Sequence, residues 1–190
     1  MRAAGTPRFA ALAVMAAAAS LPLACGGGGT AGVPAFAHAD LEKSESPVSG
    51  KIFGTKFNLD EGSGQVRRIP ASLEAPVHPE TWVVSLHSYP WSCTDNAKLP
   101  PDDGLIVTFG LEAPAADTWI NADFGDAAAA TLQKGIGTST SSNKTAPAQK
   151  GLIYLETWTV EVGAQISGKV GIRTKENGDV IGEFKATICN

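Results

Sequence analysis

The chain has 190 residues, of which 43% are hydrophobic and 18% are charged. This length suits one folded domain plus a targeting segment, and the composition excludes an intrinsically disordered chain. The net charge is −4 at pH 7, and the longest basic run is the pair Arg67 and Arg68. Binding of nucleic acid needs a clustered basic face, so we expect no nucleic-acid partner.

Residues 1–24 have the three parts of a signal peptide for export. Arg2 and Arg8 supply the positive start, residues 9–19 form an apolar run, and small residues follow. The run is shorter than the stretch of about 20 apolar residues that a membrane-spanning helix needs. We therefore expect residues 1–24 to be removed and to take no part in the fold.

The end of this leader, LPLAC at residues 21–25, resembles the lipobox of bacterial lipoproteins, with Pro22 where that class usually has leucine. The resemblance covers the leader only. It implies that Cys25 is acylated, becomes the mature N-terminus and holds the protein on a membrane of the cell envelope. Gly26, in place of an aspartate retention signal, implies the outer membrane in a bacterium that has two.

An alternative processing site lies further along the chain. Ordinary signal peptidase cleavage after Ala37 or Ala39 would leave an exported protein without a lipid, either periplasmic or secreted. Both interpretations place the protein outside the cytoplasm. Residues 25–46 are rich in Gly, Ala, Ser and Pro, which predicts a flexible tether. Residues 47–190 then form a single β-rich domain.

Strand patterns dominate that domain. Apolar and β-branched stretches bounded by Gly, Pro or Asp occur at residues 50–59, 80–89, 104–111 and 151–164. One stretch differs: Asp126 as N-cap, four alanines, Lys134 and Gly135 predict a short helix near 127–134, with a strand as the alternative.

The C-terminal stretch predicts a β-hairpin, because apolar residues alternate over 166–174 and again over 180–188. A two-residue turn at Asn177-Gly178 would place apolar residues opposite charged ones. A three-residue loop of residues 176–178 instead pairs Val170 with Phe184 and keeps one apolar face. We therefore expect the longer loop, with Gly178 in a left-handed conformation.

Cysteine usage predicts one disulfide. If Cys25 carries lipid, Cys93 and Cys189 remain, and exported proteins meet an oxidising compartment. A nucleophilic Cys93 beside His87 is the competing interpretation. Several short strands and one disulfide predict a mostly β fold, an antiparallel β-sandwich, with a closed β-barrel as the alternative.

Sequence motifs for catalysis and cofactor binding are absent. A zinc site from His78 and His87, or a calcium site in the turn of residues 121–126, lacks the expected ligand spacing. We therefore expect no metal, no cofactor and no catalytic residue that the sequence can name. A hydrolase whose titratable groups come together only in the fold remains the alternative.

Aromatic residues are the remaining candidates for a functional surface. Tyr89-Pro90-Trp91 lies in a predicted loop and is the candidate for an exposed binding surface, whereas the other tryptophans suit a sandwich core. The sequence thus predicts a lipid-tethered envelope module with a binding or structural role. Its expected partners are the membrane and an envelope protein or glycan.

Overall fold

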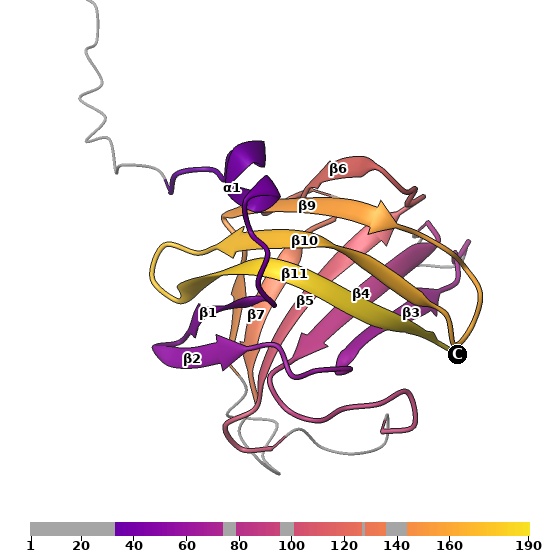
Figure 1. Ribbon diagram of the computed structural model, residues 1–190, viewed down its shortest axis with the longest axis horizontal. Coiled ribbons are helices and arrows are strands. Elements are labelled where there is room, and N and C mark those ends of the chain that lie inside the picture. The colour runs from indigo at the N-terminus through magenta and orange to yellow at the C-terminus, as the bar shows by residue number, and fades with distance from the viewer. Residues whose placement is uncertain (1–32, 74–78, 96–100, 127, 136–143) are drawn as a thin grey trace, which may run out of the picture. The chain divides into compact units, whose positions relative to one another are not determined.

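The computed structural model describes residues 33–73, 79–95, 101–126, 128–135 and 144–190, and the fold is mostly β, as the sequence predicts (Figure 1). The one helix among these residues is α1, His38–Glu42, and none of them forms a helix long and apolar enough to cross a membrane. The strands are β1 Ser49–Ile52, β2 Thr55–Asn58, β3 Gly64–Ile69, β4 Thr81–His87, β5 Leu105–Glu112, β6 Thr118–Asn121, β7 Ala130–Lys134, β8 Lys144–Pro147, β9 Lys150–Thr157, β10 Gln165–Arg173 and β11 Gly178–Cys189.

All eleven strands of the described residues belong to one hydrogen-bonded sheet. Nine of them follow the order β6-β9-β10-β11-β3-β4-β5-β7-β8, and β1 branches from β11 and pairs with β2. Strand β11 joins the two halves of the sheet, because its first residues pair with β1 and its last residues pair in parallel with β3. The other pairings are antiparallel. The sheet curls into a half-barrel, so that the strands near β10 lie across those near β4 (Figure 1).

The core fills the space between the two halves. Alternate residues of β5 and β11 point inward, and the rings of Phe109 and Phe184 meet edge-to-face with centroids 5.5 Å apart. Both rings are almost fully buried. Burial of each stabilises the fold by roughly 1.5–3 kcal/mol, so this pair is one of the contacts that hold the halves together.

The β10–β11 hairpin has the predicted inner face but a different register. Val170 pairs with Gly182 rather than with Phe184, which lies opposite Gly168. The loop is residues 175–177. The hydroxyl of Thr174 accepts the Asn177 amide and donates to the carbonyl of Gly178, the first residue of β11. A Cβ on Gly168 would lie 3.0 Å from the Phe184 ring. Glycine there makes room for the ring, which favours the observed register.

The predicted helix near 127–134 is wrong, and β7 occupies Ala130–Lys134 instead. This strand pairs with β5 on one side and β8 on the other. Ala130 and Leu132 are fully buried, whereas Thr131 and Gln133, each the next residue along the chain, are not. This alternation has the period of two that is typical of a strand. Hydrogen bonding on both edges outweighs the helix propensity of the alanines.

Candidate functional site

A disulfide joins Cys93 to Cys189, as the sequence predicts, with a Cα–Cα distance of 5.4 Å. It fastens residues 88–95, here called the covering loop, to the end of β11. The loop is also held by its backbone, since the Trp91 amide donates to Ser63 Oγ over 3.0 Å. Ser63 Oγ in turn donates to Asp60. The pairing removes Cys93 as a free nucleophile.

Tyr89 and Trp91, the predicted binding residues, lie half-buried in this loop against His87 of β4. Trp91 stacks on the imidazole with centroids 5.3 Å apart, and Tyr89 meets both rings edge-on. The Tyr89 hydroxyl lies 3.0 Å from His87 Nδ1. The two aromatic residues therefore cover a buried histidine and leave only part of their surface to solvent.

Burial controls the charge of this cluster. Desolvation, with a smaller contribution from Arg67, lowers the pKa of His87 from 6.5 to about 4, and burial raises the pKa of Tyr89 to about 12. Both groups are thus neutral at pH 7. Two nitrogens, Nε2 of His87 and Nε2 of Gln65, are buried without a hydrogen-bond partner among the described residues. His87 is a covered neutral group rather than an accessible catalytic base.

The acidic turn of residues 121–126 has a structural task. Asp123 accepts from the backbone amide of Gly151 over 2.9 Å and forms an ion pair with Lys150, so it fixes the start of β9. Within the part of the chain that the structure describes, no His, Cys, Asp or Glu residues gather in a metal-binding group. His78 and Cys25 lie outside the described residues.

The segment predicted as the end of the tether packs on the domain. Residues 34–44, here called the N-terminal arm, cross the outer face of β10 and include α1 (Figure 1). Leu41 of the arm is fully buried. At the start of α1 the Asp40 carboxylate accepts the Ala37 amide over 3.0 Å, which favours the helix because a carboxylate satisfies a free N–H there.

Three alternating residues on the outer face of β10 hold the arm, namely Lys169, Gly171 and Arg173. Lys169 Nζ donates to the carbonyls of Glu42 and Ser44 at 3.0 and 2.9 Å. It also forms an ion pair with Glu183 of β11 at 3.3 Å. An ammonium group has three donors, and these three acceptors match them.

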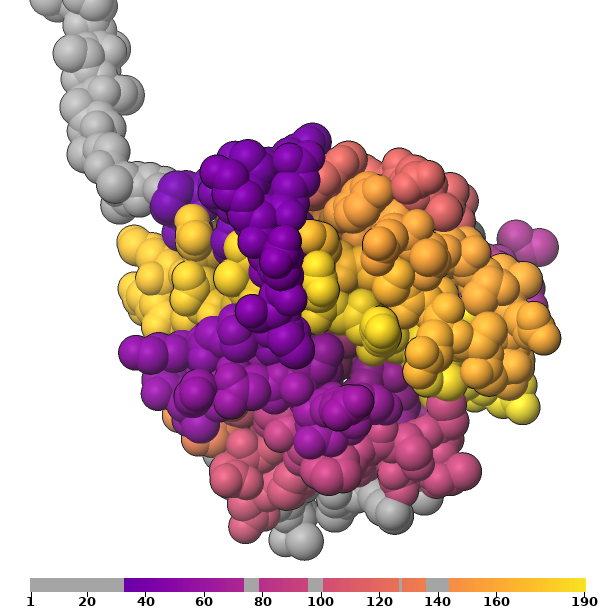
Figure 2. All heavy atoms as spheres, viewed as in Figure 1, coloured from indigo at the N-terminus to yellow at the C-terminus, as the bar shows by residue number. Residues whose placement is uncertain are grey.

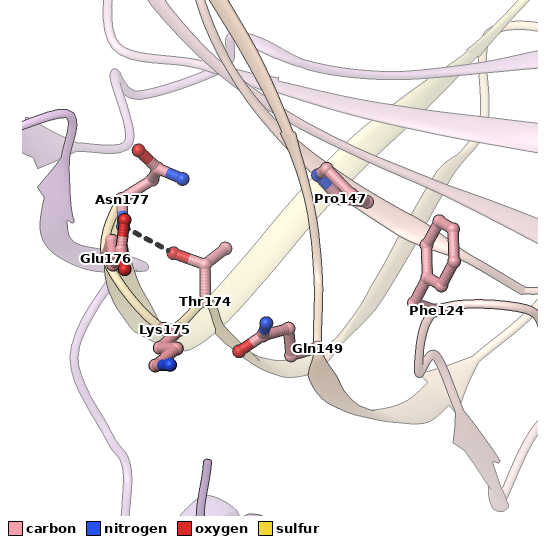
Figure 3. Close-up of a pocket in the computed structure, with 7 residues that line it drawn as sticks. All are labelled: Phe124, Pro147, Gln149, Thr174, Lys175, Glu176 and Asn177. Carbon is pink, nitrogen blue, oxygen red and sulfur yellow. Dashed lines mark hydrogen bonds between the residues drawn. The ribbon is translucent and has the colours of Figure 1, made fainter. Parts of the chain in front are cut away.

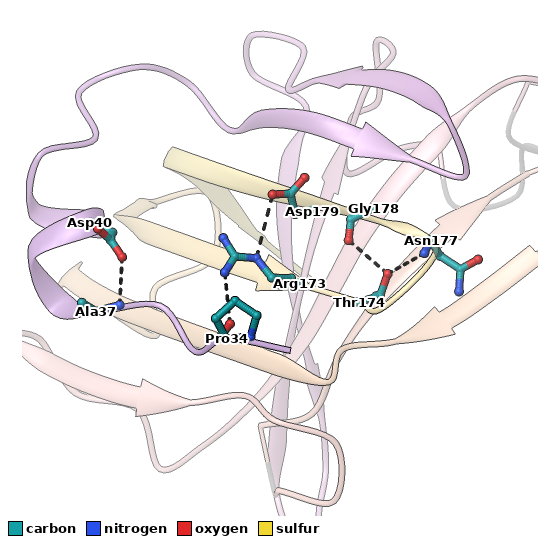
Figure 4. A network of polar contacts seen from close by, with 8 residues as sticks. All are labelled: Pro34, Ala37, Asp40, Arg173, Thr174, Asn177, Gly178 and Asp179. Atoms are coloured by element: carbon teal, nitrogen blue, oxygen red, sulfur yellow. Dashed lines mark hydrogen bonds and ion pairs between the residues drawn. The ribbon is translucent and has the colours of Figure 1, made fainter. Parts of the chain in front are cut away.

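Arg173 holds the other end of the arm (Figure 4). Its Nη1 donates to the Pro34 carbonyl over 3.0 Å, and its guanidinium lies over the Phe36 ring, 4.3 Å from the centroid. Gly171 forms the floor between the two cations, because a Cβ there would lie 3.0 Å from Phe36 and 3.1 Å from Leu41. A side chain at this position would push the arm away.

A stack of aromatic rings attaches helix α1 to the neighbouring strands β6 and β9. The ring of His38 lies parallel to Trp119 of β6 with centroids 4.1 Å apart, and Trp119 contacts Tyr154 of β9 at 4.8 Å. Tyr154 donates to Asp117 over 3.0 Å, and this hydrogen bond raises the pKa of the tyrosine. The stack connects the arm to two further strands.

Hollows occur at both ends of the β10–β11 hairpin. The tip end, beside residues 174–177, has a hollow of about 410 Å³ lined also by Phe124, Pro147 and Gln149 (Figure 3). The far end has one of about 440 Å³ lined by Trp82, Val160 and Val162 among others. Trp82 is buried there and meets Trp158, which packs against the core. The expected core role thus holds for these two tryptophans, whereas Trp119 stacks on the arm.

A third hollow, of about 490 Å³, lies on the outer face where β11 changes partner from β1 to β3. Glu156 and Lys185 contribute to its wall. Figure 2 shows this face, with the arm crossing it and the surface dipping between β11 and the segment that follows β2. Glu156 accepts from Ser167 over 2.9 Å, so this carboxylate has a partner.

Comparison with known proteins found no family model that matches the chain, and no curated protein or solved structure with significant similarity to it. The fold and surfaces therefore define only a class, a small mostly β domain whose N-terminal arm and covering loop lie on its outer face.

The arm-binding residues were missed by sequence reasoning. The signal that could have found them is the alternation of Lys169, Gly171 and Arg173, which places a bare floor between two cations on one strand face. A glycine inside a strand often marks a close approach of another segment.

Proposed function

We propose that this protein is an exported lipoprotein of the cell envelope, acylated at Cys25, with a binding or structural role rather than a catalytic one. The leader and the LPLAC stretch support acylation. The Cys93–Cys189 disulfide supports an oxidising compartment. Outer-membrane attachment follows from Gly26 through the resemblance to the lipoprotein class.

The packing of the arm on Arg173 favours one of the two predicted processing sites over the other. Cleavage after Ala37 or Ala39 would remove Pro34 and Phe36, which Arg173 holds. Cleavage after Ala39 would also remove His38 from its stack on Trp119. Processing before Cys25 leaves every contact of the arm intact, so the packing favours the lipidated form.

The same packing shortens the tether. Only residues 26–33 separate Cys25 from Pro34, the arm residue that Arg173 holds. Eight residues span at most about 29 Å when fully extended. The anchored domain is therefore held close to the bilayer and meets partners there, an envelope protein or a glycan. Tyr89 and Trp91 remain the proposed contact residues, through the part of each ring that the loop leaves exposed.

The test is metabolic labelling of the full chain with an alkynyl fatty acid in a bacterium that has two membranes. We expect label on the wild-type protein and none on Cys25→Ser. The matched control, Cys93→Ser, keeps the label because it leaves the lipobox unchanged. Unlabelled wild-type protein with a mature N-terminus at His38 or Asp40 would overturn the proposal.

A binding role is tested by pull-down of envelope proteins and glycans with two variants. Trp91→Phe retains a ring over His87, whereas Trp91→Ala removes it. We expect capture to be weakened by Trp91→Phe and lost with Trp91→Ala, while circular dichroism of Trp91→Phe stays unchanged. Equal capture by all three proteins would remove Trp91 from the binding surface.

A further inference from the structure

The described part of the chain begins near the tip end of the domain. Pro34, near the start of the described chain, is bound to Arg173 at the end of β10, directly before the hairpin tip at residues 174–177 (Figure 4). From there the arm runs away from the tip, because its later carbonyls are bound by Lys169. Because the chain is continuous, Cys25 is connected to the domain through Pro34 at this end.

The tip end also presents an uncovered aromatic side chain. Phe124, in the connection between β6 and β7, is 71% exposed and lies at the rim of the hollow that residues 174–177 line (Figure 3). Large apolar side chains that stay uncovered next to a membrane anchor are suited to the headgroup region, where interfacial segments bury Phe, Trp and Leu.

We propose that the tip end docks on the phospholipid bilayer that holds the anchor, with Phe124 entering the headgroup region. This inference rests on the proposed acylation of Cys25. The reach of residues 26–33, about 29 Å at most, keeps the tip end within range of the lipid surface. The occupant of the tip-end hollow is thus a phospholipid headgroup and the upper part of its acyl chain.

The charges at the tip end indicate whether docking requires anionic lipids in the bilayer. Lys175 and Glu176 border the same hollow and carry opposite charges. Two further cations of this end, Lys150 and Arg173, form ion pairs with Asp123 and Asp179. Each of these cations thus has an acidic neighbour, and together they do not form the basic cluster that selects anionic lipids. Docking then depends on the aromatic side chain and the tether. It should occur on zwitterionic phosphatidylcholine and change little when phosphatidylglycerol is added.

The far end of the hairpin supplies an internal control. Val160 and Val162 are exposed in the connection between β9 and β10, and the nine residues of β10 separate them from the tip. A strand rises about 3.3 Å per residue, so the two ends lie roughly 30 Å apart. Only the tip end should meet the bilayer.

The experiment uses the lipidated protein reconstituted in phosphatidylcholine vesicles that contain a headgroup nitroxide lipid. An environment-sensitive fluorophore is attached at Glu176→Cys or, as the control, at Val160→Cys. We expect strong quenching and a blue-shifted emission at position 176 and neither effect at 160. Phe124→Asp should abolish the quenching at 176, whereas Val162→Asp should leave it unchanged.

Flotation of the vesicles separates the two proposals. Protein that floats with the vesicles but shows equal, weak quenching at positions 176 and 160 would overturn the docking of the tip end and leave acylation standing. Protein that fails to float would overturn the acylation and the docking together. Quenching at 176 that persists with Phe124→Asp would remove Phe124 as the inserting residue.

Discussion

The N-terminal arm and the covering loop both cover part of the outer face of the sheet, but they are held there by different interactions. Both are segments outside the strands that lie on the outer face of the curled sheet and bury side chains beneath them. The covering loop is fixed by a covalent bond between Cys93 and Cys189. The arm is held by two cations, a glycine floor and an aromatic stack. The loop is thus secured by oxidation, and the arm depends on contacts that one substitution can weaken.

Breaking the covalent attachment should have the largest effect. The disulfide spans 96 residues, and closing such a loop in the unfolded chain is worth about 4–5 kcal/mol. We expect Cys93→Ala to lower the free energy of unfolding by about that amount in urea titrations. Cys93→Ala/Cys189→Ala should cost no more than the single change apart from the small cavity at Cys189. A single variant as stable as the wild type would show that the bond is not formed.

Removing the buried side chain of the arm should come next. Leu41 is fully buried, and truncation of a buried leucine costs about 2–5 kcal/mol, at the lower end of this range where the surrounding residues can relax into the space. We expect Leu41→Ala to release the arm, detected as faster proteolysis within residues 34–44. Leu73→Ala is the matched control, since Leu73 is 92% exposed. Equal proteolysis of both variants would contradict the docking of the arm.

The histidine beneath the covering loop predicts how the stability of the fold depends on pH. The pKa of His87 falls from 6.5 in the unfolded chain to about 4 in the fold, so the unfolded state binds more protons between these values. Stability is therefore lost as pH falls from 6.5 toward 4, by about 1.4 kcal/mol per pH unit. Urea unfolding of the wild type and His87→Phe at pH 6.5 and 5.5 checks this. A wild-type curve as flat as that of the variant would exclude a buried neutral histidine.

The smallest effect is expected for Lys169 of β10, one of the two cations that hold the arm. Lys169→Met keeps the length of the side chain and removes the hydrogen bonds to two carbonyls, which should cost about 1–2 kcal/mol. Lys185→Met, on the exposed face of β11, is the control and should be neutral. Chemical denaturation of both variants tests this, and an equal effect of the two changes would remove Lys169 from the attachment.

The two regions also differ in what the sequence could predict. Cysteine number and export context predict the disulfide, because an oxidising compartment pairs the two cysteines that remain. The sequence predicts that the arm is part of a flexible tether, because its composition is that of a flexible segment. The residues that bind the arm lie more than 120 positions away in the sequence. Local composition carries no information about such distant contacts.

The same distinction applies to the sheet. Alternation along the hairpin predicts which face of β10 and β11 is buried, because period two is a local property. It does not predict the register, which depends on the loop bonds of Thr174 and on room for Phe184 over Gly168. The alanine run of β7 is a further case, in which pairing with two neighbouring strands overrides local preference.

Hydrogen exchange at the arm tests most directly that it belongs to the domain. The amides of Asp40, Lys43 and Ser44 donate to backbone carbonyls of the arm. We predict that they exchange more slowly in the protein than in a synthetic peptide of residues 33–46, and that Lys169→Met removes part of this protection. Exchange at the rate of the free peptide would contradict the account, because the arm would then be the loose tether that its composition suggests.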